Sequence, residues 1–189
     1  DPIRTDLAEV TTDGRLRLHF HDGQRRAYAS TKRLVAVIAG TQSGKTSFAP
    51  HWLYREIQMQ GPGDYMMVTP TFPLLELKAL PEFRRLFETT LNLGRYVGSP
   101  SRRFIFSEYG AKRTFGRYDP QHPTQVLFGH AQDPESLESA TAKAAVLDEG
   151  GQKKFRLASY EAIMRRLSLA QGRVLIPTTP YDLGWLKQK

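Results

Sequence analysis

The feature that most constrains the fold is a short apolar run followed by a glycine-containing loop and then by a helical pattern. Leu34 to Ile38 is apolar and rich in β-branched residues, which predicts a strand buried on both faces. Phe48, Trp52 and Ile57 then recur at helical spacing. Residues 39–46 between them read AGTQSGKT. This order of strand, loop and helix is typical of a βαβ unit in a parallel sheet.

Apolar runs and amphipathic stretches continue to alternate towards the end of the chain. Further strands are predicted at residues 65–68, 104–106, 125–128, 144–147 and 173–176. We expect a helix from Thr71 onwards, a short acidic helix from Pro134 to Ser139, and turns around Gly110 and Gly116. The pattern predicts an α/β fold of three layers, in which helices cover both faces of a central, mainly parallel sheet. Ligands of such sheets bind at the carboxyl ends of the strands.

Residues 39–46 match the phosphate-loop (Walker A) pattern G-x-x-x-x-G-K-[ST], except that Ala39 occupies the first glycine position. Lys45 is predicted to reach the β- and γ-phosphates of ATP, and the Thr46 hydroxyl to ligate Mg²⁺. The other predicted nucleotide contacts in the loop are Gly40, Thr41, Gln42, Ser43 and Gly44, whose N–H groups would surround the phosphates. A glycine turn before an exposed lysine is the alternative, and the flanking strand and helix favour the phosphate loop.

Two adjacent carboxylates, Asp148 and Glu149, follow the apolar run at 144–147. A carboxylate at the end of such a strand can hold Mg²⁺, which is the Walker B role predicted for Asp148. Its neighbour Glu149 is the candidate general base for the attacking water. A solvated strand end is the alternative, and the phosphate loop upstream makes the catalytic interpretation the better one.

Two weaker candidates flank these motifs. Thr178 and Thr179 end the last predicted strand, where their hydroxyls could sense the γ-phosphate or its water and couple hydrolysis to motion. A plain turn is the alternative. Gln24 lies near Phe20 and Tyr28 ahead of the first strand, and its amide could pair with the edge of adenine. As an isolated glutamine it could equally lie on the surface.

The amino-acid composition indicates which classes of partner and chemistry suit this chain. Twenty-seven Lys and Arg residues against 19 Asp and Glu give a net charge of +8, which suits a polyanion such as DNA, although a solvated basic surface is the alternative. The absence of cysteine excludes disulfides and thiolate chemistry, and the five histidines show no metal-ligand spacing. Neither a membrane-spanning run nor a secretory leader is recognised.

Taken together, these motifs resemble the ATPase motor domain of the large terminase subunits of tailed phages. The likeness spans the whole chain, in the order Gly23-Gln24, the phosphate loop, Thr69-Pro70-Thr71, Leu147-Asp148-Glu149-Gly150, and Thr178-Thr179-Pro180 followed by Gly184-Trp185. The resemblance implies a P-loop NTPase fold of the ASCE (RecA-like) class. It also implies an ATPase that forms a homo-oligomeric ring and drives double-stranded DNA into a procapsid, with a portal protein and a small terminase subunit as partners.

By this resemblance, residues 1–189 form one ATPase domain, in which residues 1–32 contribute to the adenine side. The C-terminal nuclease domain of complete large terminases is not expected in this chain, and neither is nuclease activity. Such a phage-encoded protein would act in the host cytoplasm, away from membranes. The isolated chain could be a monomer.

Two departures from the family concern arginine. Many relatives carry arginine early in the phosphate loop, where this chain has Thr41, and many carry another in the segment that here reads Leu137-Glu138-Ser139-Ala140. An arginine finger is worth roughly 10³- to 10⁵-fold in turnover. The candidates for this role elsewhere in the chain are Arg102, Arg103, Arg113 and Arg117.

Two other functions stay open at this point. One is a helicase lobe of superfamily 1 or 2, although Gly150-Gly151 after the acidic pair departs from the helicase motifs. The other is a module that binds nucleotide and DNA without turnover as a monomer. Basic residues that could grip DNA phosphates without sequence preference are Lys112, Arg113, Arg117, Lys153, Lys154, Arg165 and Arg166.

Overall fold

The computed structural model describes residues 7–133, 137, 141–180 and 183–188. The acidic helix expected from Pro134 to Ser139 lies outside the described residues, apart from Leu137. No helix in the described ranges is both long enough and apolar enough to cross a membrane.

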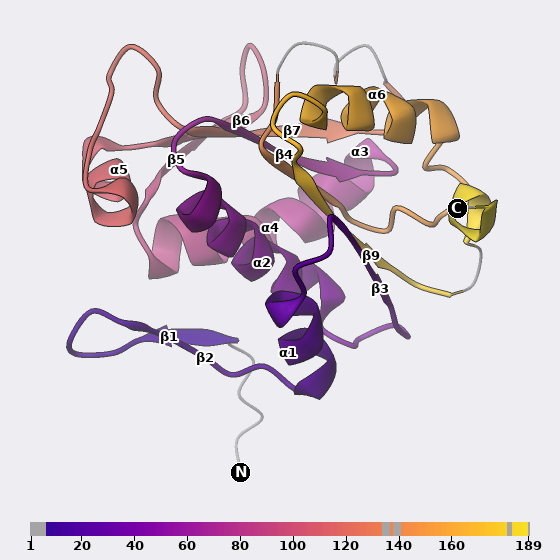
Figure 1. Ribbon diagram of the computed structural model, residues 1–189, viewed down its shortest axis with the longest axis horizontal. Coiled ribbons are helices and arrows are strands. Elements are labelled where there is room, and N and C mark those ends of the chain that lie inside the picture. The colour runs from indigo at the N-terminus through magenta and orange to yellow at the C-terminus, as the bar shows by residue number, and fades with distance from the viewer. Residues whose placement is uncertain (1–6, 134–136, 138–140, 181–182, 189) are drawn as a thin grey trace.

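A seven-stranded mixed sheet forms the centre of the molecule (Figure 1). Its strand order is β3 (Leu34–Ile38), β9 (Arg173–Thr178), β8 (Ala144–Leu147), β4 (Asp64–Thr69), β7 (Gln125–His130), β6 (Arg103–Phe106) and β5 (Gly94–Val97). The first five strands run parallel, and β6 and β5 complete the sheet as antiparallel neighbours. Two short strands ahead of this sheet, β1 (Ala8–Val10) and β2 (Leu16–Leu18), form a separate antiparallel hairpin.

Helices cover both faces of the large sheet. One face packs against α1 (Asp22–Ala29), α2 (Lys45–Gln60) and the continuous helical segment α3 (Phe72–Leu74), η1 (Leu75–Ala79), α4 (Leu80–Arg84) and η2 (Arg85–Thr90). The other face packs against α6 (Leu157–Leu167) and the 3-10 helix η4 (Gly184–Gln188). Each layer has its own core, with Trp52 and Phe83 on the first side and Ile163 and Trp185 on the second. The predicted three-layer α/β fold is confirmed.

The prediction that Leu34 to Ile38 is buried on both faces is wrong. These residues do form a strand, but β3 lies at the edge of the sheet beside β9. Val35 is buried, whereas Leu34 is 40% and Ile38 50% exposed. An apolar run therefore predicted the strand here without revealing that one of its faces is left open to solvent.

The turn expected around Gly110 is also wrong, because this residue lies inside helix α5 (Glu108–Phe115). The Ser107 side chain caps the helix by accepting a hydrogen bond from the Gly110 N–H at 3.1 Å. A Cβ atom on Gly110 would lie 1.9 Å from the carbonyl oxygen of Leu93, so glycine permits close packing here. Gly116 ends the helix with a φ of 72°, a left-handed conformation that favours glycine.

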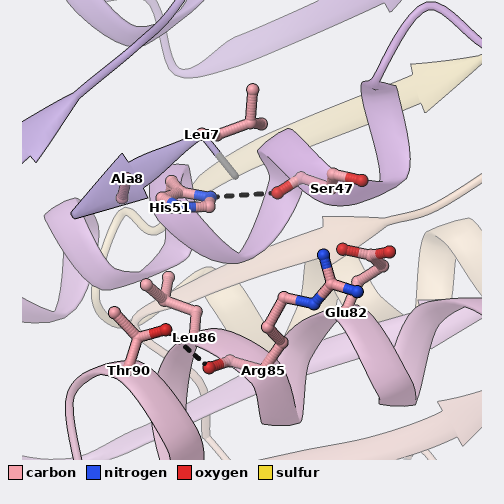
Figure 2. A pocket seen from close by; sticks show the side chains of 8 residues that line it. All are labelled: Leu7, Ala8, Ser47, His51, Glu82, Arg85, Leu86 and Thr90. Carbon is pink, nitrogen blue, oxygen red and sulfur yellow. Dashed lines mark hydrogen bonds between the residues drawn. The ribbon is translucent and has the colours of Figure 1, made fainter. Parts of the chain in front are cut away.

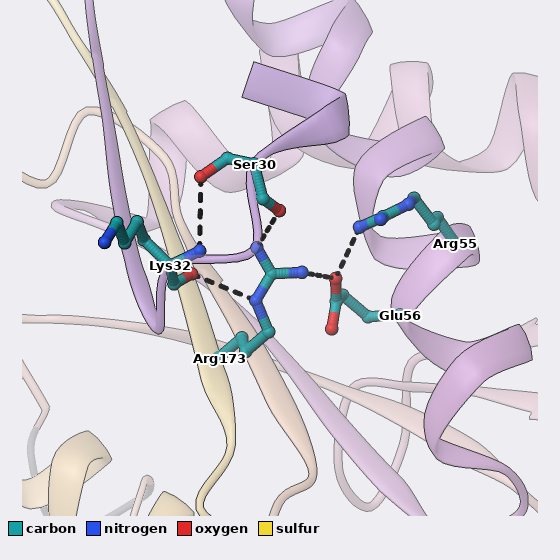
Figure 3. Close-up of polar contacts among 5 residues, drawn as sticks. All are labelled: Ser30, Lys32, Arg55, Glu56 and Arg173. Atoms are coloured by element: carbon teal, nitrogen blue, oxygen red, sulfur yellow. Dashed lines mark hydrogen bonds and ion pairs between the residues drawn. The ribbon is translucent and has the colours of Figure 1, made fainter. Parts of the chain in front are cut away.

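A buried ion pair connects the far end of α2 to the beginning of β9 (Figure 3). The Arg173 guanidinium pairs with Glu56, whose side chain is fully buried, and Arg55 approaches the same carboxylate at 3.3 Å. Arg173 also donates to the carbonyl oxygens of Ser30 at 2.5 Å and of Lys32 at 3.0 Å. One side chain on β9 thus holds the end of α1, the approach to β3 and the end of α2 together.

Candidate nucleotide-binding site

The loop of residues 39–44 leaves the carboxyl end of β3 and turns directly into α2. Gly44 caps α2 with a φ of 75°, and Gln42 has a φ of 60°, so the loop contains two left-handed positions. Such a conformation directs successive backbone N–H groups towards one point, and the positive end of the helix dipole lies beside them. This local geometry suits an anion-binding loop, and phosphate binding by it stays a prediction.

Lys45 is the first residue of α2, and its side chain folds back over the loop. It is buried, and its ammonium donates to the carbonyl oxygens of Ala39 at 2.8 Å and Gly40 at 2.6 Å. A third hydrogen bond reaches Ser43 Oγ at 3.2 Å. These contacts hold the positive charge against the loop, where it can meet a phosphate bound by the same backbone.

Asp148 lies at the end of β8 and faces the start of α2. Its Oδ2 accepts a hydrogen bond from the Thr46 hydroxyl at 3.4 Å, while its Oδ1 is buried and has no hydrogen-bond partner among the described residues. Burial raises the pKa of the Asp148 carboxyl to about 7, and the negative charge of Glu149 adds to this. A buried carboxylate with an unsatisfied oxygen beside a hydroxyl is the donor set of a hard divalent cation.

Mg²⁺ therefore fits this position, and Thr46 and Asp148 are the residues that would hold it. No cluster of three or more His, Cys, Asp or Glu side chains that could hold a metal occurs in the described part of the chain. Mg²⁺ in nucleotide sites commonly takes only one or two protein ligands and completes its shell with phosphate oxygens and water.

Glu149 is held by the end of β9. Its carboxylate accepts hydrogen bonds from the Thr179 N–H at 3.0 Å and from the Thr179 hydroxyl at 2.9 Å. Glu149 has a φ of 52°, a left-handed conformation that is uncommon for a residue with a side chain. The neighbouring Thr178 hydroxyl accepts from the Gly151 N–H at 3.1 Å. Both threonines that the sequence singled out thus contact the segment that carries the candidate base.

These groups line one cavity of about 400 Å³, which we call the phosphate cavity. The residues around it are Thr41, Gln42, Ser43, Gly44, Lys45, Thr46, Ser47, Leu74, Lys78, Asp148, Glu149 and Thr179. The cavity joins the predicted loop, acidic pair and one of the two threonines, although these lie far apart in the sequence. It also includes Lys78 on η1, which belongs to none of the sequence motifs.

Gln24 lies on α1, beside a second groove of about 390 Å³ that shares Ser43 and Lys45 with the phosphate cavity. Gln24 is buried, its amide oxygen accepts from the His21 N–H at 3.2 Å, and its amide nitrogen donates to the Gly44 carbonyl oxygen at 3.4 Å. Gln24 therefore connects α1 to the phosphate loop. Contact with adenine stays a prediction. Phe20, which lies near Gln24 in the sequence, packs into the core against Phe48.

A separate cavity between the hairpin, α2, α4 and η2 is lined by His51, Ser47, Arg85 and other residues (Figure 2). Its volume is about 30 Å³, which is room for one water molecule. The two larger grooves at the phosphate loop have the size of a ligand site.

None of the four candidate finger arginines is among the described residues that line the phosphate cavity. Arg102 pairs with Glu76 at 3.4 Å and stacks on the Phe72 ring, and Arg113 donates to a backbone carbonyl oxygen at 3.1 Å. Arg103 and Arg117 each line a cavity that includes Gly63. Gly63 precedes the first residue of β4, so both cavities lie at the amino end of this strand, away from the phosphate loop. The structure therefore does not bring these arginines to the phosphate cavity of their own chain.

A mainly parallel sheet, a phosphate loop after its edge strand and an acidic pair two strands away define a P-loop NTPase fold. Within this class the chain is similar to large terminases. It is 27% identical over 176 residues to the large terminase subunit of Thermus phage G20c, an alignment that covers 87% of this chain and 34% of that protein. The chain thus spans about a third of the length of this relative. No family model matches it.

Solved structures give the same result at the level of the fold. The large terminase ATPase domain of Thermus phage P74-26 aligns with a TM-score of 0.64 and 22% identity, over 89% of this chain and 68% of that one. The large terminase of bacteriophage D6E in complex with ATP-γ-S aligns with a TM-score of 0.63 and 12% identity, over 84% of this chain and 38% of that one. The UvsW helicase of bacteriophage T4 aligns with a TM-score of 0.54 and 16% identity, over 85% of this chain and 53% of that one. The resemblance to phage large terminases that the motifs indicated is confirmed.

Proposed function

We propose that this chain hydrolyses ATP to ADP and phosphate, and that it is the motor domain of a large terminase subunit that moves double-stranded viral DNA into a procapsid. One observation carries the proposal. The phosphate loop, Asp148, Glu149 and Thr179 line one cavity at the carboxyl edge of the sheet. The named relatives supply the biological setting.

Each group in the cavity has a role that its surroundings support. The loop N–H groups and Lys45 bind the phosphates, and Thr46 and Asp148 hold Mg²⁺, which neutralises phosphate charge when bound. Glu149 accepts the proton of the attacking water, and Thr179 fixes the direction of its carboxylate through the hydrogen bonds described above. Gln24 positions α1 against the loop on the adenine side.

Partners and setting follow from the likeness to terminases and belong to the proposal as well. They are double-stranded DNA, a portal protein, a small terminase subunit and further copies of the chain in a ring, all in the host cytoplasm. The net charge of +8 supports a polyanionic partner. We also propose that residues 1–189 act as one ATPase domain.

A helicase lobe is the second candidate, because the UvsW helicase shares the fold. In this chain, however, Gly150 and Gly151 pack tightly behind the acidic pair. A Cβ on Gly151 would lie 2.8 Å from the Thr178 hydroxyl. Strand unwinding by the purified chain would favour the helicase.

The deciding experiment is steady-state ATP turnover as a function of protein concentration, with Lys45→Ala and Glu149→Gln run in parallel. Lys45→Ala should lose most affinity for nucleotide. Glu149→Gln should bind ATP normally and lose roughly 10²- to 10⁴-fold in turnover. Glu161→Gln, which removes an exposed carboxylate on α6, is the matched control and should behave as the wild type.

The outcomes separate the alternatives. Turnover per chain that rises with concentration would indicate that a neighbouring subunit completes the site. Constant turnover per chain would place every catalytic group within one chain. ATP binding without turnover at any concentration would favour a nucleotide-binding module, and full activity of Glu149→Gln would remove Glu149 from the role of base.

A further inference from the structure

Lys78 lines the phosphate cavity from the side opposite the phosphate loop. The loop follows β3, whereas η1, which carries Lys78, follows β4, and strands β9 and β8 lie between them in the sheet. Those two middle strands lead to Thr179, Asp148 and Glu149. Lys45 and Lys78 are therefore the two cations among the described residues that line this cavity, and they enter it from different elements.

The backbone around Lys78 is fixed by packing, while its side chain is available. Leu75 and Ala79 at the two ends of η1 are fully buried, and Lys78 is exposed. Residues 75–79 form a π-helical turn, a feature that occurs frequently at functional sites. Within the described ranges Lys78 has no hydrogen bond or ion pair, in contrast to the three hydrogen bonds of Lys45.

Lys78 shares the cavity with the acidic pair. Asp148 and Glu149 both line it, so the ammonium of Lys78 and the two carboxylates face the same space. A neighbouring arginine is less suited to the task, because Arg102 is paired with Glu76 and stacked on Phe72. The phosphate loop of residues 39–46 contains one cation, Lys45, so a second cation at the phosphates has to come from another element.

We propose that Lys78 is a catalytic residue that acts within its own chain and contacts the γ-phosphate of ATP. The inference rests on the proposed ATPase function. In the reaction, the water oxygen forms a bond to the γ-phosphorus and gives its proton to Glu149. The bond from phosphorus to the bridging oxygen breaks, and ADP leaves with that electron pair. The ammonium of Lys78 neutralises charge on the transferred phosphoryl group, as a point charge with three donors.

The test compares Lys78→Ala, Lys78→Arg and the control Lys187→Ala, which removes an exposed lysine on η4. We expect Lys78→Ala to lower kcat roughly 100-fold, by analogy with the loss of one preorganised donor to a developing charge. Its affinity for ATP-γ-S should fall about tenfold, as for the loss of one charge-assisted contact, while its affinity for ADP should stay within about twofold. Lys78→Arg should recover part of kcat, and Lys187→Ala should leave kcat and both affinities unchanged.

A purely structural role would lower ADP and ATP-γ-S affinity together and shift the thermal unfolding midpoint, and either result would overturn the assignment. Unchanged kcat and unchanged ATP-γ-S affinity in Lys78→Ala would also overturn it, while leaving the ATPase function intact. A wild-type chain that bound no ATP would instead refute the proposed function, and the role of Lys78 with it.

Discussion

His51 makes the stability of this protein depend on pH in a direction that can be calculated. It lies on α2, where its Nδ1–H donates to the Ser47 carbonyl oxygen at 2.9 Å, and its ring packs against Phe20 beside the small cavity of Figure 2. Burial lowers the pKa of His51 to about 4 from the ordinary value of 6.5. The difference corresponds to about 3 kcal/mol between the two protonation states, at about 1.4 kcal/mol per pH unit.

The sign follows from which state takes up the proton. Between pH 6.5 and pH 4 the unfolded chain binds a proton at His51 that the folded chain does not, so the free energy of unfolding falls as the pH falls through this window. Above the window His51 has no effect, and below it the loss is complete. At pH 5 the expected loss is about 2 kcal/mol.

The assay is urea unfolding of wild type and His51→Gln between pH 5 and pH 7.5. Glutamine keeps a donor for the Ser47 carbonyl and cannot ionise. The effect of Asp148 on stability must be separated from that of His51. The pKa of Asp148 is raised to about 7, so its protonation stabilises the folded state as the pH falls, which is the opposite direction. It is present in both proteins, so the difference between them isolates His51.

We expect the stability of His51→Gln relative to wild type to rise by about 2 kcal/mol on going from pH 7.5 to pH 5. His122→Gln removes an exposed histidine and serves as the control. A difference between His51→Gln and wild type that did not vary with pH would refute the reasoning. It would mean that His51 is solvated or protonated in the folded protein.

Two further predictions concern the ends of β9. Thr179→Val removes the hydroxyl that holds Glu149, so kcat should fall roughly tenfold or more with ATP affinity unchanged. Thr179→Ser should restore kcat. Rapid-quench measurements of a single turnover test this prediction, and an unchanged rate in Thr179→Val would contradict it. Arg173→Met leaves the buried Glu56 without its main partner and should lower the free energy of unfolding by about 3–5 kcal/mol in urea titrations. Adding Glu56→Gln should recover part of that loss, and no recovery would show that packing dominates.

The phosphate loop and the acidic pair could be predicted because each is a contiguous signal next to an apolar run. Parallel strands then bring the ends of separate runs to one edge of a sheet, which is why Lys45 and Asp148 lie in one cavity. The fold class followed from the same alternation of elements. Neither inference required knowledge of the order of strands in the sheet.

The features that were missed depend on that order or on tertiary packing. β3 is an edge strand because of sheet topology, which an apolar run does not encode. Gly110 suggested a turn because of its residue type, but it lies inside α5, where the missing Cβ allows close packing against Leu93. Lys78 carries no local signal, since it is one charge in an amphipathic stretch and gains meaning only from the cavity that it lines.

Strand β9 gives a physical reason why the site and the rest of the domain should respond together. At its carboxyl end Thr179 holds the candidate base, and at its amino end Arg173 holds the ends of α1 and α2. Between these points β9 pairs in parallel with β3 along all five residues of that strand. The phosphate loop lies between β3 and α2, so both elements that flank it are fixed to β9. A shift of Glu149 against Thr179 therefore acts on a unit whose parts cannot move separately without breaking strand pairing or a buried ion pair.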